Sequence, residues 1–287
     1  MLRCRGTAER AALFEGRMSG VTDYLWGVVA RTAEEGWALF GGVFVLAVAL
    51  WFVSQRLRGY GSGLLGMKYY WLVAPGVACH ETGHALGCLL TGTKIYKFVP
   101  FRPEGNTLGY VSHETKPGLG WQIGNFFIAT GPVWFGCALI LLAAHLFTGE
   151  EFLSAFGALA PRPGEGVWVH CKGVWYGAIW MLQTVFAPWR WGTPLFPVFA
   201  YLVFCVASEI TLSPPDLEGM WKGLAAIAAG LFLVNLVPVA SGWLARGVEA
   251  LRPGLFAAQT LLFFVLLADL AFLAVVRLAW GVFAKRR

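Results

Sequence analysis

Apolar segments long enough to cross a lipid bilayer recur along this chain, and they constrain its fold more than any other feature. A membrane-spanning helix needs about 20 mostly apolar residues. Because the bilayer interior offers no water, backbone N–H and C=O groups there must pair within the protein, which favours helices. The candidate spans are 37–55, 70–91, 123–147, 195–213, 223–240 and 255–280. The sequence therefore predicts an all-α polytopic membrane protein with about six transmembrane helices.

Composition agrees with this fold class. The chain is 57% hydrophobic and 13% charged, whereas soluble domains carry about 25% charged residues. The net charge of +6 is spread over loops and ends, as membrane orientation requires, so the lipid bilayer rather than nucleic acid is the expected partner. We expect one membrane-embedded domain over 37–287 and an N-terminal cytoplasmic segment over 1–36. Met1 and Met18 are both candidate starts, and no oligomeric state is indicated.

Charged residues also predict an orientation. If the N-terminus lies inside the cell, Lys and Arg are more frequent in the inside segments than in the outside loops, which is the usual bias. We therefore expect a multi-pass protein of the cell membrane with both termini in the cytoplasm. The segment 167–189 has an apolar centre between Lys172 and Arg190, which predicts an interfacial or re-entrant segment, and a seventh span is the alternative.

The second predicted span carries His80-Glu-Thr-Gly-His84. His-Glu-x-x-His on a helix places two imidazoles one turn apart on the same face, where they can bind Zn²⁺. The Glu81 carboxylate can then accept a proton from a metal-bound water. Ionisable residues inside a membrane segment are costly and indicate function. The alternative is a coincidence, with two histidines that form hydrogen bonds inside a helical bundle.

A catalytic zinc usually has three protein ligands and a water, so a third ligand is expected. Asp216 is our candidate, because it follows Pro214 and Pro215, and a backbone break at membrane depth is tolerated where it lines a cavity. The alternative for Asp216 is a helix-capping role. This assignment requires an even number of membrane crossings between the motif and residue 216. The competing carboxylates are Glu209, Asp269 and Glu218.

A β-hairpin is predicted between the second and third spans, over 93–113. Two β-prone runs flank a turn at Gly105-Asn106. Its edge strand could capture an extended peptide by strand addition, since unpaired strand edges are templates for pairing. The alternative is a plain connecting loop.

These features together resemble the site-two protease family of intramembrane zinc metalloproteases. The resemblance covers roughly residues 70–240. It is strongest at His80-Glu-Thr-Gly-His84, and Ile128-Ala-Thr-Gly-Pro132 is similar to the family's Ala-Gly-Pro segment. The family's third-ligand motif, Asn-x-x-Pro-x-x-x-Leu-Asp-Gly, is split here between Asn235-Leu-Val-Pro238 and the earlier Pro214-Pro-Asp-Leu-Glu-Gly219. The resemblance implies a Zn²⁺ cofactor, a membrane-anchored protein substrate and cleavage within or beside its membrane segment.

The expected function is therefore that of a zinc metalloendopeptidase that cleaves a membrane protein substrate. His80, His84 and Asp216 would bind Zn²⁺, and Glu81 would be the general base. Asn235 would hydrogen-bond the extended substrate backbone, or else form an interhelical hydrogen bond. A non-proteolytic zinc-binding scaffold or assembly factor is the second hypothesis. A metal transporter is a third, although the chain lacks the clear internal repeat expected of one.

Overall fold

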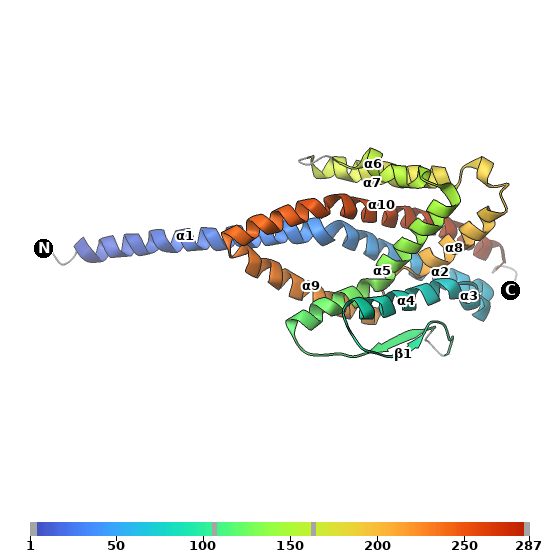
Figure 1. Ribbon diagram of the computed structural model, residues 1–287, viewed down its shortest axis with the longest axis horizontal. Coiled ribbons are helices and arrows are strands. Elements are labelled where there is room, and N and C mark those ends of the chain that lie inside the picture. Colours follow the sequence, from blue (N-terminus) through green and yellow to red (C-terminus); the bar gives the residue numbers. More distant parts are fainter. Residues whose placement is uncertain (1–4, 105–107, 162–164, 284–287) are drawn as a thin grey trace.

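The computed structural model describes residues 5–104, 108–161 and 165–283, and most of them are helical (Figure 1). The helices are α1 Arg5–Gly36, η1 Trp37–Gly41, α2 Gly42–Leu65, α3 Met67–Leu72, α4 Ala74–Leu90, α5 Leu119–Thr148, α6 Glu151–Leu159, α7 Val167–Val185, η2 Pro188–Arg190, α8 Leu195–Glu209, α9 Pro214–Asn235 and α10 Pro238–Phe283. Two strands, β1 Ile95–Val99 and β2 Tyr110–His113, form a small sheet. The predicted fold class, a helical membrane protein with a short β-hairpin after the motif helix, is confirmed at this level.

Helices long and apolar enough to cross a membrane number four in the described chain, so the predicted count of six is not confirmed. They are Gly20–Leu65, Leu119–Thr148, Pro214–Asn235 and Pro238–Val282. The predicted spans 70–91 and 195–213 contain α4 with 17 residues and α8 with 15 residues. Both are shorter than the roughly 20 residues that a complete crossing requires. The motif helix α4 by itself is therefore shorter than a full-length span.

The first long helix contains a short π-helical turn near its middle, and it continues through this turn without a break. A π-helical turn, Trp37–Gly41, joins α1 directly to α2, and the backbone stays in the right-handed helical region at Gly36 and Gly42. The predicted boundary at residue 36 therefore falls inside one continuous helix. The stretch Gly20–Leu65 of this helix contains a segment apolar and long enough to cross a membrane.

Helices α8 and α9 run one after the other in the same direction, antiparallel to α5. The Phe199 ring of α8 stacks on Phe147 near the end of α5, with ring centroids 4.7 Å apart. Further along, Ile210 packs at Gly136, and Gly223 of α9 packs against Phe126 near the beginning of α5. The structure therefore does not confirm 195–213 and 223–240 as two successive spans, which would run in opposite directions. The Pro214-Pro215 break interrupts the helix without reversing the chain.

The segment between α5 and α8 leaves one end of α5 and returns to it. Helices α6 and α7 are antiparallel, since Gly173 lies against the carbonyl oxygen of Leu159. The Arg190 guanidinium then bonds to Glu151 at 2.7 Å and to the carbonyl of Phe147 at 3.3 Å. The α6–α7 hairpin therefore begins and ends at the same end of α5 and does not carry the chain to the other end. It fits the predicted re-entrant segment at 167–189 better than a seventh span.

Helix α10 packs parallel to α2, which sets where the chain ends. Gly42, Ser54 and Gly63 of α2 contact, in order, Gln259, Asp269 and Trp280 of α10. The first residues of α1 and the last of α10 consequently lie at opposite ends of the long axis (Figure 1). This arrangement does not support the expectation that both termini lie on one side of the membrane.

The β-sheet lies beside α4 and follows it in the chain (Figure 1). Strands β1 and β2 pair antiparallel, with Val99 opposite Tyr110 and an irregularity between Ile95 and Lys97. The predicted hairpin strands are therefore present, while the predicted turn at Gly105-Asn106 lies outside the described residues. Helices α4 and α5 approach closely at Gly131 because this residue has no side chain. A Cβ at this position would stand only 2.3 Å from the Gly83 carbonyl oxygen. This contact brings the motif helix against α5.

Candidate metal site

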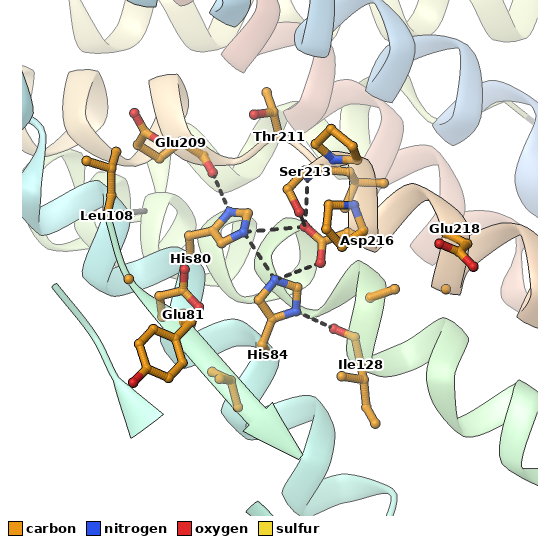
Figure 2. Close-up of a pocket in the computed structure, with 18 of the residues that line it drawn as sticks. His80, Glu81, His84, Leu108, Ile128, Glu209, Thr211, Ser213, Asp216 and Glu218 are labelled. Atoms are coloured by element: carbon orange, nitrogen blue, oxygen red, sulfur yellow. Dashed lines mark hydrogen bonds and ion pairs between the residues drawn. The ribbon is translucent and has the colours of Figure 1, made fainter. Parts of the chain in front are cut away.

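Three predicted ligands converge in a pocket between α4, α5 and the start of α9 (Figure 2). His80 and His84 extend from one face of α4, and their Nε2 atoms lie 3.1 Å apart. The carboxylate of Asp216, in the first turn of α9, lies 3.2 Å from His84 Nε2 and 3.6 Å from His80 Nε2. All three side chains are largely buried. These residues form a group that could hold a metal ion.

The hydrogen bonds around the two imidazoles identify the role of each nitrogen. His80 Nδ1 lies 2.9 Å from the carbonyl oxygen of Glu209, and His84 Nδ1 lies 2.8 Å from that of Ile128. Carbonyl oxygens only accept, so each Nδ1 must carry the hydrogen. In the neutral rings both Nε2 lone pairs then point toward one another and toward a carboxylate. Three such atoms facing one point of a buried site could hold a metal ion, and two imidazoles with one carboxylate are a donor set that zinc accepts.

Both carbonyl acceptors are free because the helix hydrogen-bond pattern ends or is interrupted there. Pro132 lies inside α5 and has no N–H to donate to the residue four positions earlier, which is Ile128. Glu209 is the last residue of α8, where carbonyls lack intrahelical donors. Each histidine therefore binds a carbonyl that the helix itself leaves unpaired. Such contacts fix the orientation of a ligand ring before a metal binds.

Asp216 has a structural role and a site role at the same time. Its Oδ2 accepts hydrogen bonds from the Ser213 backbone N–H at 2.8 Å and from the Ser213 hydroxyl, and so completes a capping box at the start of α9. Its Oδ1 faces His84. The capping alternative and the ligand prediction therefore both describe this residue. The cap holds the carboxylate in place, so that it does not have to be ordered by a metal.

A cavity of about 710 Å³ opens at the three residues, and Glu81 lines it with them. Glu81 is buried, next to His80 on α4. The β-hairpin forms another wall through Gly109, Tyr110 and Val111. A Cβ at Gly109 would stand 2.8 Å from the Glu81 side chain and 2.9 Å from the Val99 carbonyl oxygen. Glycine at 109 therefore allows the hairpin to close over Glu81.

The competing carboxylates have other partners. Glu209 lines the same cavity, but its carboxylate forms an ion pair with Arg58 of α2 at 2.8 Å. Asp269 is fully buried and accepts a hydrogen bond from Ser54 at 3.3 Å. Glu218 lines the cavity and pairs with Lys222 at 2.6 Å. None of the three belongs to the group formed by His80, His84 and Asp216.

Asn235 does not lie in this cavity. It is fully buried at the other end of α9, and its side-chain amide donates to Glu35 at 2.6 Å and to Thr32 at 3.3 Å on α1. The interhelical hydrogen bond considered as the alternative is thus the arrangement in the structure. The Asn-x-x-Pro half of the family pattern and the Asp216 half occupy opposite ends of one helix.

Sequence reasoning did not identify the parts that support the ligands. Arg58 lies beyond the end of the predicted span 37–55, whereas α2 continues to Leu65 and brings Arg58 to Glu209. The free carbonyl of Ile128 could be predicted from the sequence, since a proline inside a helix, here Pro132, leaves the carbonyl four residues earlier without its helical donor. No family model, curated protein or solved structure matches the chain.

Proposed function

We propose that this protein is a zinc-dependent intramembrane endopeptidase of the cell membrane. The observation that carries the proposal is the convergence of His80, His84 and Asp216 beside Glu81, in one cavity of a bundle with membrane-length apolar helices. Two metal-binding histidines one turn apart, with an acidic residue between them, are the usual arrangement of a zinc hydrolase site. The resemblance to the site-two protease family points to the same reaction class.

The side chains have distinct roles in the proposed reaction. His80, His84 and Asp216 hold the zinc, which when bound makes a coordinated water more acidic and polarises the scissile carbonyl. The Glu81 carboxylate takes the proton of the attacking water and passes it to the leaving amine.

The proposed substrate is a membrane-anchored protein, which is cleaved within or next to its transmembrane segment. Strand β2 lines the cavity, and among the described residues its only strand partner is β1, which leaves its other edge without a paired strand. An extended substrate segment pairs with this edge and presents its backbone to the metal site. A substrate helix must therefore unwind locally before cleavage, since only an extended strand forms these hydrogen bonds.

The test compares purified wild-type protein with E81Q after both are reconstituted in vesicles with single-pass membrane proteins extracted from the host cell. Mass spectrometry of peptide termini should detect new cleavage sites in or near transmembrane segments with the wild type and zinc. E81Q should bind zinc normally but generate no new termini, because an amide cannot accept the proton.

E218Q is the matched control, because Glu218 lines the same cavity but is exposed and paired with Lys222. It should cleave like the wild type. Cleavage by E81Q at the wild-type rate would exclude Glu81 as the base. Zinc binding by the wild type without any zinc-dependent cleavage would favour the non-proteolytic scaffold.

A further inference from the structure

We infer that Arg58 and Glu209 are positioning residues for the metal, because their ion pair fixes the carbonyl that holds His80. The inference concerns the metal site of the proposed function and extends it to a helix, α2, that provides no ligand. The chain of contacts is continuous. Arg58 bonds to the Glu209 carboxylate at 2.8 Å, and the Glu209 backbone carbonyl accepts the Nδ1 hydrogen of His80 at 2.9 Å.

Glu209 depends on Arg58 for its charge compensation. Its side chain is only 6% exposed, while that of Arg58 is 31% exposed. The second carboxylate oxygen, Oε1, has no hydrogen-bond partner among the described residues. A carboxylate that is buried on this scale is stable in its charged form only when it is paired. Loss of the Arg58 charge would therefore displace the Glu209 side chain.

Glu209 lies at the end of a helix, so the contacts of its side chain help to hold its backbone carbonyl in place. It is the last residue of α8, and the non-helical segment 210–213 follows before α9 begins. Helix ends fray unless they are held by other contacts. Arg58 ties this end to α2, and Gly76 lets α4 approach α8, since a Cβ there would stand 1.8 Å from the Cys205 carbonyl oxygen. Three helices therefore meet at the carbonyl that orients His80.

The two histidines differ in how they are supported. The carbonyl that holds His84 belongs to Ile128 in the middle of α5, where the helix continues on both sides. The carbonyl that holds His80 lies at a helix end, where the Arg58–Glu209 ion pair adds to the packing of Ile210 at Gly136. We therefore expect metal affinity to respond to the Arg58–Glu209 pair, even though neither side chain is a metal ligand.

The experiment measures Zn²⁺ affinity of the detergent-purified chain by competition with a chromophoric chelator. A second readout is the visible absorption spectrum of the Co²⁺-loaded protein. R58M should weaken Zn²⁺ binding by about 10- to 100-fold, the range typical for loss of a group that orients a ligand. It should also shift the Co²⁺ bands, because the His80 ring is no longer held in one orientation. R58K keeps the positive charge and should recover part of the affinity.

R190M is the matched control. Arg190 also forms a 2.7 Å interhelical ion pair, with Glu151, but at the far end of α5. R190M should leave the Zn²⁺ affinity and the Co²⁺ spectrum unchanged. If R190M weakens Zn²⁺ binding as much as R58M does, the effect is one of general stability and the inference is overturned.

The double variant R58M/E209M separates positioning from destabilisation. It removes both charges and fills the space with apolar side chains, which often restores stability after a buried pair is broken. Its melting temperature should recover relative to R58M, while its Zn²⁺ affinity should remain low. Recovery of wild-type affinity in the double variant would overturn the inference.

Failure of the inference is distinguishable from failure of the proposed function. H80A in the same assay removes a ligand and should abolish tight Zn²⁺ binding. If H80A loses zinc while R58M and R58M/E209M bind it as tightly as the wild type, only the positioning role is wrong. If the wild type itself binds no Zn²⁺, the metal site and the function proposed from it are both wrong.

Discussion

Pro132 lies four residues after Ile128 in α5, and because it has no N–H, the Ile128 carbonyl is free to accept the Nδ1 hydrogen of His84 at 2.8 Å. A residue usually regarded as a helix breaker thus provides the acceptor that orients a metal ligand. The neighbouring Gly131 lets α4 approach closely enough for this hydrogen bond to form. The Gly131-Pro132 pair consequently connects helix packing with the geometry of the metal site.

Replacement of this proline gives the first prediction. In P132A the new backbone N–H competes for the Ile128 carbonyl, so His84 loses part of its support. Zn²⁺ affinity should fall by about 10-fold, the lower end of the range for lost orienting partners. The melting temperature should not fall, because alanine restores a helical hydrogen bond. Chelator competition and circular dichroism melting measure the two effects.

Pro253, inside α10, provides the control. P253A makes the same chemical change in a helix that provides no ligand and should leave Zn²⁺ affinity unaltered. Equal losses of affinity in both variants would mean that the orienting role assigned to Pro132 is incorrect.

The second prediction separates the two roles of Asp216. D216N keeps an oxygen that can accept from Ser213 but lacks the carboxylate charge, so it should retain most of the cap and lose zinc. D216A should lose zinc and the Asp216 half of the capping box, with an additional cost of about 0.5–1.5 kcal/mol in unfolding free energy for the lost hydrogen bond to Ser213. The zinc loss should exceed about 100-fold in each variant, because even an orienting partner is worth about 10- to 100-fold.

D269N is the comparison for Asp216, since Asp269 is a fully buried carboxylate that bonds to Ser54 away from the cavity. Metal analysis of the purified D269N protein should show zinc at the wild-type level. Zinc loss in D269N together with retention in D216N would transfer the third-ligand assignment to Asp269.

The third prediction concerns Asn235. Its amide joins α9 to Glu35 of α1, so N235A should lower the unfolding free energy by about 1–2 kcal/mol, as expected for an interhelical hydrogen bond in a membrane protein. Thermal melting in detergent measures this change. Zn²⁺ affinity should be unaffected, because Asn235 does not line the cavity. A raised KM for a cleaved substrate at unchanged stability would instead support the substrate-binding role that the family resemblance implied.

The sequence by itself determined the parts that depend on local chemistry. Long apolar segments define membrane helices, because backbone groups there have no water to pair with. The i and i+4 spacing places His80 and His84 on one helix face wherever that helix lies. The Pro-Pro-Asp order indicated a helix start with a carboxylate available to a cavity, and the structure brings Asp216 to both histidines.

Tertiary structure decided the features that depend on how helices meet. The sequence interpretation used the parity of membrane crossings to bring Asp216 to the motif, whereas the structure does so because α8 and α9 form one interrupted passage along α5 and the interruption lies beside α4. A proline break shows where a helix stops but contains no information about the direction in which the chain continues. The contacts of Arg58 with Glu209 and of Asn235 with Glu35 each join residues at least 150 positions apart. Such pairings depend on the packing of whole helices, and local sequence patterns do not specify them.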